Sequence, residues 1–303
     1  MKILVTGSNG LLGQKLVYAL SDRSEIQLVA CARGENRIRR KTGYTYISAD
    51  LSDESRVREI LQKHQPDCII HTAAMTNVDA CELDPESCKK HNVDSVRYLL
   101  DACKNPATHF IYLSTDFVFD GTAGPYRETD PINPLSVYAR SKAEAETMIM
   151  HSGLPWAILR TMIIYGVVDD AQRSNIVLWT KSSLEEGKDI RVISDQFRGP
   201  TLAEDLADAC IQAALHRRTG LYHVSGREVL SILEIACRVA DFFHLDKKHI
   251  HPVSTAELNQ PALRPLKTGF IIDKAEKELN YHPRSLEEGL EILSDQLRKK
   301  ESH

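Results

Sequence analysis

The stretch KILVTGSNGLLG (Lys2–Gly13) decides the fold of this 303-residue chain. It opens with a short apolar run, which is typical of a buried parallel strand. Gly7, Gly10 and Gly13 follow at three-residue spacing, and apolar residues then recur with helical periodicity. The glycines therefore lie in a strand-to-helix turn, where the backbone and the positive helix end can approach a pyrophosphate. The spacing is GxxGxxG rather than the standard GxGxxG, but its position directly after a strand favours a dinucleotide site.

The adenosine end of this expected site lies after the second predicted strand, Ile26–Ala32. NAD sites of this kind usually carry an acid there, which binds the ribose 2′-hydroxyl. Here Arg33 follows the strand, three more arginines come by Arg40, and Glu35 is close by. A guanidinium suits a 2′-phosphate, so we favour NADP(H) over NAD(H) as the cofactor. The alternative is a basic loop that only faces solvent.

Asp50 is a second candidate at the adenosine end. It follows Tyr44–Ala49, an alternating apolar stretch that predicts a third strand. Its carboxylate would accept a hydrogen bond from the adenine amino group. The alternative is a role in a helix N-cap region, because Ser52–Ser55 also begins a helix. The two roles are compatible.

Strand and helix signals continue to alternate along the first half of the chain. The predicted strands are Asp67–Thr72, His109–Ser114 and Pro155–Thr161, and the predicted helices are Pro85–Cys103 and Pro134–His151. This rhythm predicts an α/β fold with a Rossmann-like, doubly wound parallel sheet. Right-handed crossovers place all strand carboxyl ends at one edge. That edge collects the glycine loop, Ala73, Ala74, Ser114, Thr115 and Arg160.

After about Gly166 the rhythm changes. Helices are predicted at Asn175–Gly187, Ala203–Arg217, Ile232–Phe243, Asp273–Leu279 and Leu286–Leu297, and short strands at Ile190–Ile193 and Gly220–Val224. We expect residues 1–166 to form the dinucleotide-binding domain and 167–303 to form mainly a smaller, C-terminal substrate-binding lobe. The division leaves open whether the chain crosses back to the first domain. A ligand cleft is expected between the two lobes.

Ser114-Thr115-Asp116, Tyr138 and Lys142 are the candidate catalytic groups. Tyr138 and Lys142 are four residues apart, so on a helix they share a face. A phenol with a pKa of roughly 10 is a poor acid at neutral pH. A nearby ammonium would lower that pKa and make the pair a proton relay, with Thr115 able to hydrogen-bond the same oxygen. The alternative is a solvated helix face, which is the usual meaning of YxxxK alone.

Composition excludes several classes of function. The net charge is −4 and the pI is near 6.3, so we expect no nucleic-acid partner and no polybasic membrane contact. No apolar stretch approaches the length of a membrane span. The start MKILVTG enters a strand directly, without the features of a signal peptide, so we expect a cytoplasmic protein.

The seven cysteines predict neither a disulfide framework nor a metal centre. They are odd in number and scattered, and none forms CxxC. Most stand in apolar contexts, as reduced, buried thiols do. Cys81, Cys88 and His91 are the nearest approach to a ligand set, but they lack a partner pair. We therefore predict no metal site.

Longer motifs resemble the extended short-chain dehydrogenase/reductases, and within them the dTDP-4-dehydrorhamnose reductases. The matching stretches run over most of the chain. They are TGSNGLLG (Thr6–Gly13), HTAAMTNVDACE (His71–Glu82), STDFVFDG (Ser114–Gly121), PYRETDPINPLSVYARSKAEAE (Pro125–Glu146), LRTMIIYG (Leu159–Gly166), DQFRGPTLAEDLA (Asp195–Ala207) and Arg264-Pro265. The resemblance implies reduction of a 4-keto nucleotide sugar by NADPH. The middle segments are specific, whereas the glycine loop alone fits many proteins.

The resemblance also implies roles for particular residues. Thr115, Tyr138 and Lys142 would be the catalytic trio, with Tyr138 protonating the oxygen as hydride arrives and Lys142 also holding the nicotinamide ribose. The expected cofactor residues are Gly7, Asn9, Gly10, Leu11, Leu12, Gly13, Arg33, Asp50, Leu51, Ala73, Ala74, Tyr138 and Lys142. The expected substrate residues are Thr76, Val78, Asp116, Phe117, Gln196 and Thr201.

Two departures from the family pattern leave the sugar open. The family often has Trp where Ile163 stands and tends to have Gly where Arg198 stands. An isoleucine loses a stacking surface, and an arginine adds charge where substrate or a partner would lie. Phe117 stands where sugar dehydratases tend to have Glu, which argues against dehydration.

Two other functions remain open at this point. An epimerase would return the hydride to its substrate and would usually need a second acid–base residue, for which Cys81 is a poor candidate. The regulatory subunit of methionine adenosyltransferase shares this fold, binds NADP, and is similar around Arg198, Pro200 and Thr201. A homodimer is common for the fold, although no interface can be located. Some relatives place magnesium between subunits, but no ligand set for it is predicted here.

Overall fold

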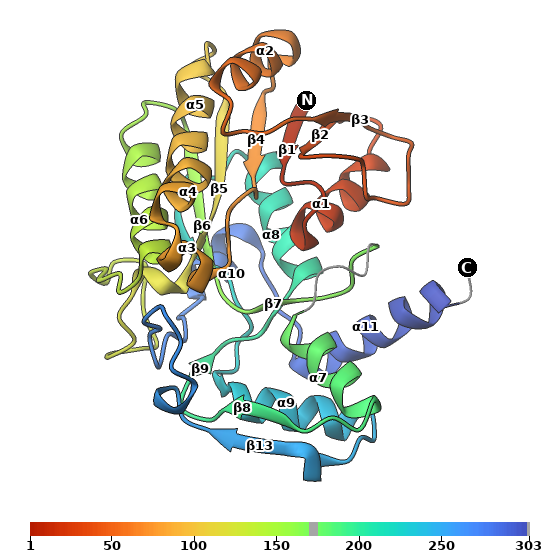
Figure 1. Ribbon diagram of the computed structural model, residues 1–303. Coiled ribbons are helices and arrows are strands. Elements are labelled where there is room, and N and C mark those ends of the chain that lie inside the picture. Colours follow the sequence, from red (N-terminus) through yellow and green to blue (C-terminus); the bar gives the residue numbers. More distant parts are fainter. Residues whose placement is uncertain (170–174, 302–303) are drawn as a thin grey trace.

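A seven-stranded parallel sheet forms the centre of the molecule (Figure 1). The computed structural model describes residues 1–169 and 175–301. The strands are β1 (Lys2–Thr6), β2 (Gln27–Ala32), β3 (Thr45–Ser48), β4 (Cys68–His71), β5 (His109–Thr115), β6 (Trp156–Thr161) and β11 (Gly220–His223), in the order β11-β6-β5-β4-β1-β2-β3. The direction of winding reverses between β1 and β4, which is where open α/β sheets bind ligands. The predicted doubly wound fold is confirmed.

Helices cover both faces of this sheet, which explains why its central strands are continuously apolar. One face packs against α2 (Glu54–His64), α5 (Ser95–Ala102) and α6 (Val137–Met150). The other packs against α1 (Leu11–Ser21), α8 (Ala203–Leu215) and α10 (Asp273–Leu279). In β1, the side chains of Ile3 and Val5 pack in the core on the α1 side of the sheet, and that of Leu4 packs in the core on the α2 side. Strands buried on both faces need no polar alternation.

The helix predicted over Pro85–Cys103 is interrupted by a wider turn. Its parts are α4 (Pro85–Lys89), the π-helical turn η1 (Lys90–Asp94) and α5. Within that turn Asn92 accepts a hydrogen bond from the Met75 amide (2.8 Å) and donates one to its carbonyl (3.1 Å). Single π-helical turns are frequent at functional sites, and Met75 follows the end of β4. Two short helices, α3 (Val78–Leu83) and the 3₁₀ turn η2 (Asp116–Val118), lie nearby.

The smaller lobe lies at the end of the molecule opposite the N-terminus (Figure 1). Its helices are α7 (Ile176–Glu185), α9 (Ile232–Phe242) and α11 (Leu286–Glu301), with 3₁₀ turns η3 (Lys247–His249) and η4 (Ala256–Leu258). Its strand pairs are β8 (Ile190–Ile193) with β13 (Ile250–Val253), and β9 (Phe197–Arg198) with β12 (Leu230–Ser231). A third pair, β7 (Ile164–Tyr165) with β10 (Thr201–Leu202), leads back to α8 and β11. The chain therefore returns to the central sheet before it completes this lobe.

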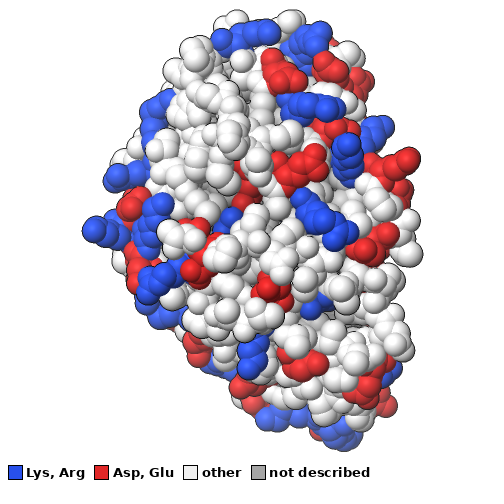
Figure 2. Space-filling view, turned by 90° about the vertical axis from the view of Figure 1, so that its left-hand side faces the viewer, with Lys and Arg blue, Asp and Glu red and all other residues white. Residues whose placement is uncertain are grey.

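Charges on the surface are mixed. Figure 2 views the molecule from the side on which α6 lies in Figure 1, and there acidic and basic side chains are interspersed around uncharged areas. Within residues 1–169 and 175–301, no helix has the length and apolar character that crossing a bilayer requires.

A buried ion pair fixes α6 to the sheet. Arg160 near the end of β6 donates two hydrogen bonds to Glu146 of α6, at 3.0 and 2.7 Å. The two side chains are 3% and 1% exposed, so water cannot replace either partner. Because α6 also carries Tyr138 and Lys142, this pair sets where those side chains stand relative to β5 and β6.

We predict that Glu146→Ala lowers the free energy of unfolding by roughly 3–5 kcal/mol, because it leaves the Arg160 charge buried without a counterion. Guanidinium chloride unfolding measures this change. The control is Glu54→Ala, which removes the exposed partner of Arg58 and should cost at most about 1 kcal/mol. Equal losses in the two variants would contradict the structural role given to the buried pair.

Candidate active site

A cleft of about 980 Å³ opens at the carboxyl edge of the sheet. Every cofactor residue expected from the sequence lines it, as do Thr115, Asp116 and Phe117. These residues come from the loops after β1, β2, β3, β4 and β5, together with α6. Segments that are far apart in the chain thus meet on one concave surface, as is typical of a binding site.

The glycine turn brings the backbone of β1 close to the loop after β4. Gly7 has a φ of 70°, and a Cβ placed on it would lie 2.7 Å from the Ala73 nitrogen. Gly10 caps α1 without any side-chain hydrogen bond, and the first turn of α1 holds no acid. By contrast, Asp53 caps α2 through its side chain. The N–H groups that begin α1 are therefore available to an anion such as a pyrophosphate.

Asn9 holds the basic loop that follows β2. Its amide nitrogen donates to the carbonyls of Arg33 (3.3 Å) and Glu35 (2.8 Å), and its oxygen accepts from the Arg37 amide (2.9 Å). The Arg33 and Arg37 side chains both line the cleft, whereas that of Glu35 does not. Two guanidinium groups thus stand at the adenosine end. Arg37 was not among the predicted site residues, although its place in the arginine-rich run was the signal for it.

Asp50 lines the same end of the cleft and is not the cap of α2. Its Oδ1 accepts from the amide (2.9 Å) and the hydroxyl (2.8 Å) of Ser52, and Asp53 performs the capping. Its other oxygen lies 3.8 Å from Arg33, whose side chain is 66% exposed. Asp50 therefore keeps capacity to accept a hydrogen bond, and Arg33 is free to move toward a phosphate.

Thr115 and Tyr138 meet at the inner end of the cleft. Ser136 caps α6 by accepting from the Ala139 amide at 3.2 Å, which places Tyr138 in the first turn. Thr115 ends β5, and its hydroxyl accepts from the Phe117 amide at 3.2 Å. Burial raises the pKa of the Tyr138 phenol, and its hydrogen bond with Thr115 opposes that rise. The two oxygens are thus close enough to act on one carbonyl oxygen.

Lys142 stands beneath this pair rather than beside the phenol. Its Nζ donates to the Leu113 carbonyl at 2.7 Å and lies 4.0 Å from the centre of the Tyr112 ring. Burial lowers the pKa of Lys142 to about 7. The expectation that this ammonium lowers the pKa of Tyr138 is wrong for this arrangement, because removal from water dominates both groups.

The wall behind Tyr138 is formed by two thiols and a polar bridge. Cys81 and Cys88 are fully buried against Tyr138. Asn92 donates to the Ser141 hydroxyl at 3.0 Å, which links the π-helical turn to α6. No periodicity in the sequence indicates this contact. Among the residues that the structure describes, no cluster of three potential ligands could hold a metal ion.

The predicted substrate residues divide into two groups. Those that line the cleft are Thr76, Val78, Asp116 and Phe117. Gln196 and Thr201 do not line it. Gln196 is 5% exposed and donates to the Thr255 hydroxyl at 3.0 Å, and Thr201 is fully buried with its hydroxyl donating to the Gly199 carbonyl at 3.1 Å. Their side-chain polar atoms are used in hydrogen bonds within the protein rather than exposed in the cleft.

Ile163 lines the cleft in a strained conformation. Its φ is 34°, a region that a β-branched residue rarely enters. Its carbonyl accepts from the Thr201 amide at 3.3 Å, so the turn is held from the β10 side. Strain of this kind gathers at binding sites. The position at which the family often has Trp is therefore a cleft residue here as well.

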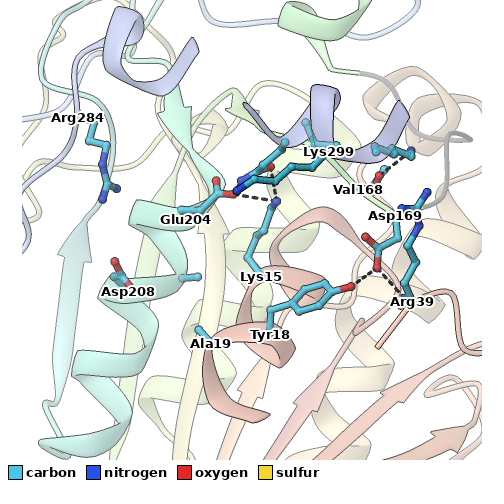
Figure 3. A pocket seen from close by; sticks show the side chains of 14 residues that line it. Lys15, Tyr18, Ala19, Arg39, Val168, Asp169, Glu204, Asp208, Arg284 and Lys299 are labelled. Carbon is cyan, nitrogen blue, oxygen red and sulfur yellow. Dashed lines mark hydrogen bonds and ion pairs between the residues drawn. The ribbon is translucent and has the colours of Figure 1, made fainter. Parts of the chain in front are cut away.

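A second hollow, of about 770 Å³, lies between α1, α8 and α11 (Figure 3). Its charged and polar groups largely bind one another. Lys15 contacts Glu204 (2.8 Å) and Gln296 (2.9 Å), and Tyr18 donates to Asp169 at 2.6 Å. The contacts of Lys15 join the C-terminal helix α11 to α1 and α8.

Comparison with known proteins gives consistent results. The family described as "RmlD substrate binding domain" matches residues 1–299. The bovine (Bos taurus) methionine adenosyltransferase 2 subunit beta is 33% identical over 84% of this chain and 75% of its own length. The dTDP-4-dehydrorhamnose reductase of Aggregatibacter actinomycetemcomitans is 30% identical over 96% of this chain and 98% of its own. The structure of the Bacillus anthracis dTDP-4-dehydrorhamnose reductase in complex with NADP superposes with a TM-score of 0.83 at 26% identity, covering 97% and 99% of the two chains.

The chain therefore belongs to the RmlD substrate-binding domain family, within the extended short-chain dehydrogenase/reductases.

We predict that Lys142→Met alters the pH dependence of stability. The folded pKa of about 7 lies below the unfolded value of about 10.4. Burying the charged lysine therefore destabilises the protein fully below pH 7, and the cost disappears as pH rises from about 7 to 10. Relative to the unsubstituted protein, the variant should gain stability below pH 7 and lose that advantage by about pH 10. Chemical unfolding at several pH values measures the difference. A constant difference would show that Lys142 titrates normally.

Proposed function

We propose that this protein reduces a 4-keto nucleotide sugar with NADPH, and that its substrate is dTDP-4-dehydrorhamnose, which it converts to dTDP-L-rhamnose. The observation that carries the proposal is the meeting of Thr115 and Tyr138 in a cleft that also contains the open N-terminus of α1. Family membership and the reductase from Aggregatibacter actinomycetemcomitans support it.

The residues of the cleft fit a nicotinamide dinucleotide. The α1 N-terminus and the glycine turn would hold the pyrophosphate, and Asp50 and Arg33 would hold the adenosine half. Lys142 would hold the nicotinamide ribose. When bound, NADPH supplies a hydride to the carbonyl carbon of the sugar.

The protein's own part in the reaction is to supply a proton and to orient the carbonyl. Tyr138 donates its phenolic proton to the carbonyl oxygen as that oxygen gains charge. The Thr115 hydroxyl stands beside the phenol and helps to position it against the carbonyl oxygen. The high pKa of the buried phenol keeps Tyr138 protonated before the reaction.

A second candidate is a regulatory subunit that binds the cofactor without turnover. It is favoured by the bovine methionine adenosyltransferase 2 subunit beta, which matches at an identity similar to that of the reductase. An intact set of motifs does not by itself prove catalysis. The two candidates share the cofactor cleft and differ in whether Tyr138 transfers a proton.

We predict that Tyr138→Phe abolishes reduction while leaving cofactor binding intact. The assay follows NADPH oxidation with a panel of 4-keto nucleotide sugars that includes dTDP-4-dehydrorhamnose. Loss of the proton donor should lower kcat by about 10²–10⁴-fold, with the Kd for NADPH unchanged because the phenol is one contact among many.

The matched control is Tyr98→Phe, which removes a phenol from α5 outside the cleft and should retain full activity. Absence of turnover by the unsubstituted protein across the panel, together with capture of a methionine adenosyltransferase catalytic subunit, would favour the regulatory candidate instead.

We predict that Arg33→Ser removes most of the preference for NADPH over NADH. The guanidinium would make charge-assisted hydrogen bonds to the 2′-phosphate, each worth about 1.5–3 kcal/mol, so the Kd for NADPH should rise by roughly 10–100-fold. The Kd for NADH should change little. Arg58→Ser, on the exposed face of α2, controls for the change in net charge. Equal weakening of both cofactors would remove Arg33 from the 2′-phosphate site.

A further inference from the structure

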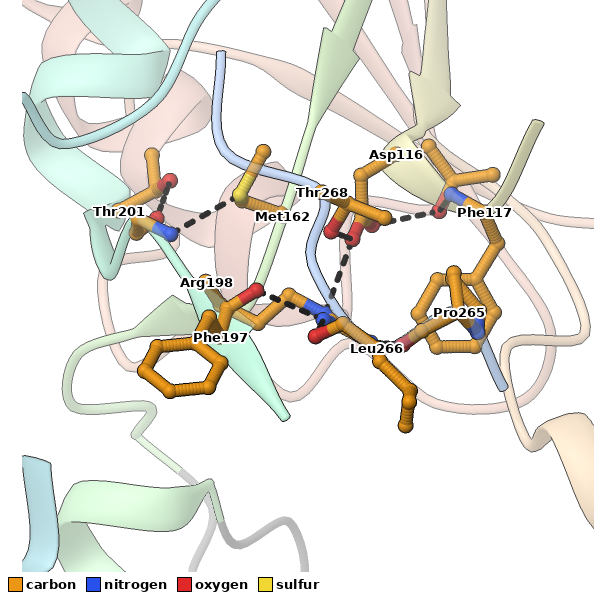
Figure 4. Close-up of polar contacts among 11 residues, drawn as sticks. Asp116, Phe117, Met162, Phe197, Arg198, Thr201, Pro265, Leu266 and Thr268 are labelled. Atoms are coloured by element: carbon orange, nitrogen blue, oxygen red, sulfur yellow. Dashed lines mark hydrogen bonds and ion pairs between the residues drawn. The ribbon is translucent and has the colours of Figure 1, made fainter. Parts of the chain in front are cut away.

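Asp116 is buried at the catalytic end of the cleft and is fully engaged by protein groups (Figure 4). It is 3% exposed. Its Oδ1 accepts from the Thr115 hydroxyl at 3.1 Å, and its Oδ2 accepts from the Thr268 hydroxyl at 2.5 Å. The same Oδ2 forms an ion pair with Arg198, 3.1 Å from its Nε. The carboxylate thus lies one hydrogen bond from the proposed catalytic hydroxyl.

Arg198 is equally buried and its guanidinium joins three chain segments. It is 3% exposed. One terminal nitrogen donates to the carbonyls of Phe197 (2.7 Å) and Leu266 (3.0 Å), and the other donates to the carbonyl of Pro265 (2.6 Å). The guanidinium carbon also lies 5.4 Å from the centre of the Phe117 ring. The Arg198 guanidinium, which the sequence analysis expected where substrate or a partner would lie, is therefore bound by protein groups and is not available to a ligand.

The state of Asp116 decides how the Thr115 hydroxyl is oriented. An ionised carboxylate only accepts hydrogen bonds, so Thr115 must direct its proton to Asp116. The Thr115 oxygen then accepts from the Phe117 amide and stands beside the Tyr138 phenol. A protonated Asp116 could donate instead, and the direction of the Thr115 proton would no longer be fixed.

Charges from two elements act on Asp116. Burial raises its pKa, and Arg198 from β9 is the largest influence that lowers it. The Tyr138 phenol of α6 also interacts with the carboxylate. Arg264 acts on Arg198 from the segment that precedes Thr268. Without the guanidinium, the pKa of Asp116 would rise further, and the neutral carboxyl group would be favoured.

We propose that Arg198 is a positioning residue for the reduction: it pairs with the Asp116 carboxylate, favours its ionised form and holds it in place, and Asp116 in turn fixes the orientation of the Thr115 hydroxyl beside Tyr138. This inference rests on the proposed function. It extends that function by giving a role to a residue that does not line the cleft. The contacts also tie β9 of the smaller lobe to the end of β5, so the position of that lobe is coupled to the catalytic hydroxyl.

The kinetic test compares Arg198→Met with the unsubstituted protein. A misplaced catalytic group costs on the order of 100-fold, so kcat at pH 7 should fall about that much while the Kd for NADPH stays unchanged. The activity of the variant should recover as pH rises, because Asp116 ionises again. Arg198→Lys keeps the positive charge but replaces the planar guanidinium and its several N–H donors with a single nitrogen. This variant should show an intermediate kcat without the added pH dependence.

Two further variants separate positioning from folding. The double variant Asp116→Asn/Arg198→Met should lose the added pH dependence, since no titrating group remains. Arg264→Met removes an ion pair with Asp79 in the neighbouring segment and is the matched control. It should lower stability without adding a pH slope to kcat. A pH-independent loss of kcat in Arg198→Met, equal to that in Arg264→Met, would overturn the proposal.

Stability gives a readout that does not depend on turnover. Loss of Arg198 raises the folded pKa of Asp116 further above its unfolded value, so the variant loses additional stability as pH rises through that higher folded pKa. The midpoint difference from the unsubstituted protein in urea should therefore grow as pH rises, and that of Arg264→Met should stay constant. A constant difference in both variants would overturn the inference even if the protein is a reductase. If the midpoint difference grows with pH but the protein turns over no keto sugar, the effect of Arg198 on the ionisation of Asp116 is supported and only the proposed function is overturned.

Discussion

The close approach of the glycine turn to the end of β4 is the constraint on which the cleft depends. No side chain fits between Gly7 and the Ala73 backbone, so β1 and β4 can lie side by side up to their carboxyl ends only with glycine at this turn. That contact places the uncapped start of α1 and the loop after β4 on one wall. The same strand order then carries β5, with Thr115 at its end, to the next position in the sheet. The cofactor groups and the proposed catalytic groups are neighbours because the sheet reverses its winding here.

Burial on the α6 side creates the chemistry and also costs stability. Tyr138 and Lys142 face the sheet, where removal from water favours the neutral form of each. The Glu146–Arg160 pair holds α6 in this position, and its carboxylate also favours the charged form of Lys142. The phenol of Tyr138, which is the proposed proton donor, is thereby kept protonated, and Lys142 is kept near the point where it changes charge. A group with a pKa close to neutral responds to a bound ligand more readily than one that is always charged.

Local patterns in the sequence were sufficient to predict the fold and the residues that line the cleft around the glycine turn. The glycine turn, the arginines after β2 and the i, i+4 spacing of Tyr138 and Lys142 each depend on residues close together in the chain. The errors arose where a distant segment decides the outcome. Gln196 is withdrawn from the cleft by Thr255, 59 residues later, and the π-helical turn follows from the bond between Asn92 and Met75. The raised pKa of Tyr138 reflects its burial, which no spacing reveals.

The residue pair Asp116 and Arg198 changes what can select the sugar. An arginine alone would make this end of the cleft cationic, and an aspartate alone would make it anionic. Bound to each other and to neutral hydroxyl and carbonyl groups, they leave it without net charge. In the proposed reductase, selection of the sugar ring would then rest on shape and on uncharged contacts. The cleft residues that can provide these are Phe117, which is held beneath the guanidinium, Ile163 in its strained turn, and Thr76. Because Ile163 offers less surface than the Trp often found in the family, discrimination between related 4-keto sugars should depend mainly on where the Phe117 ring is held, and therefore on Arg198.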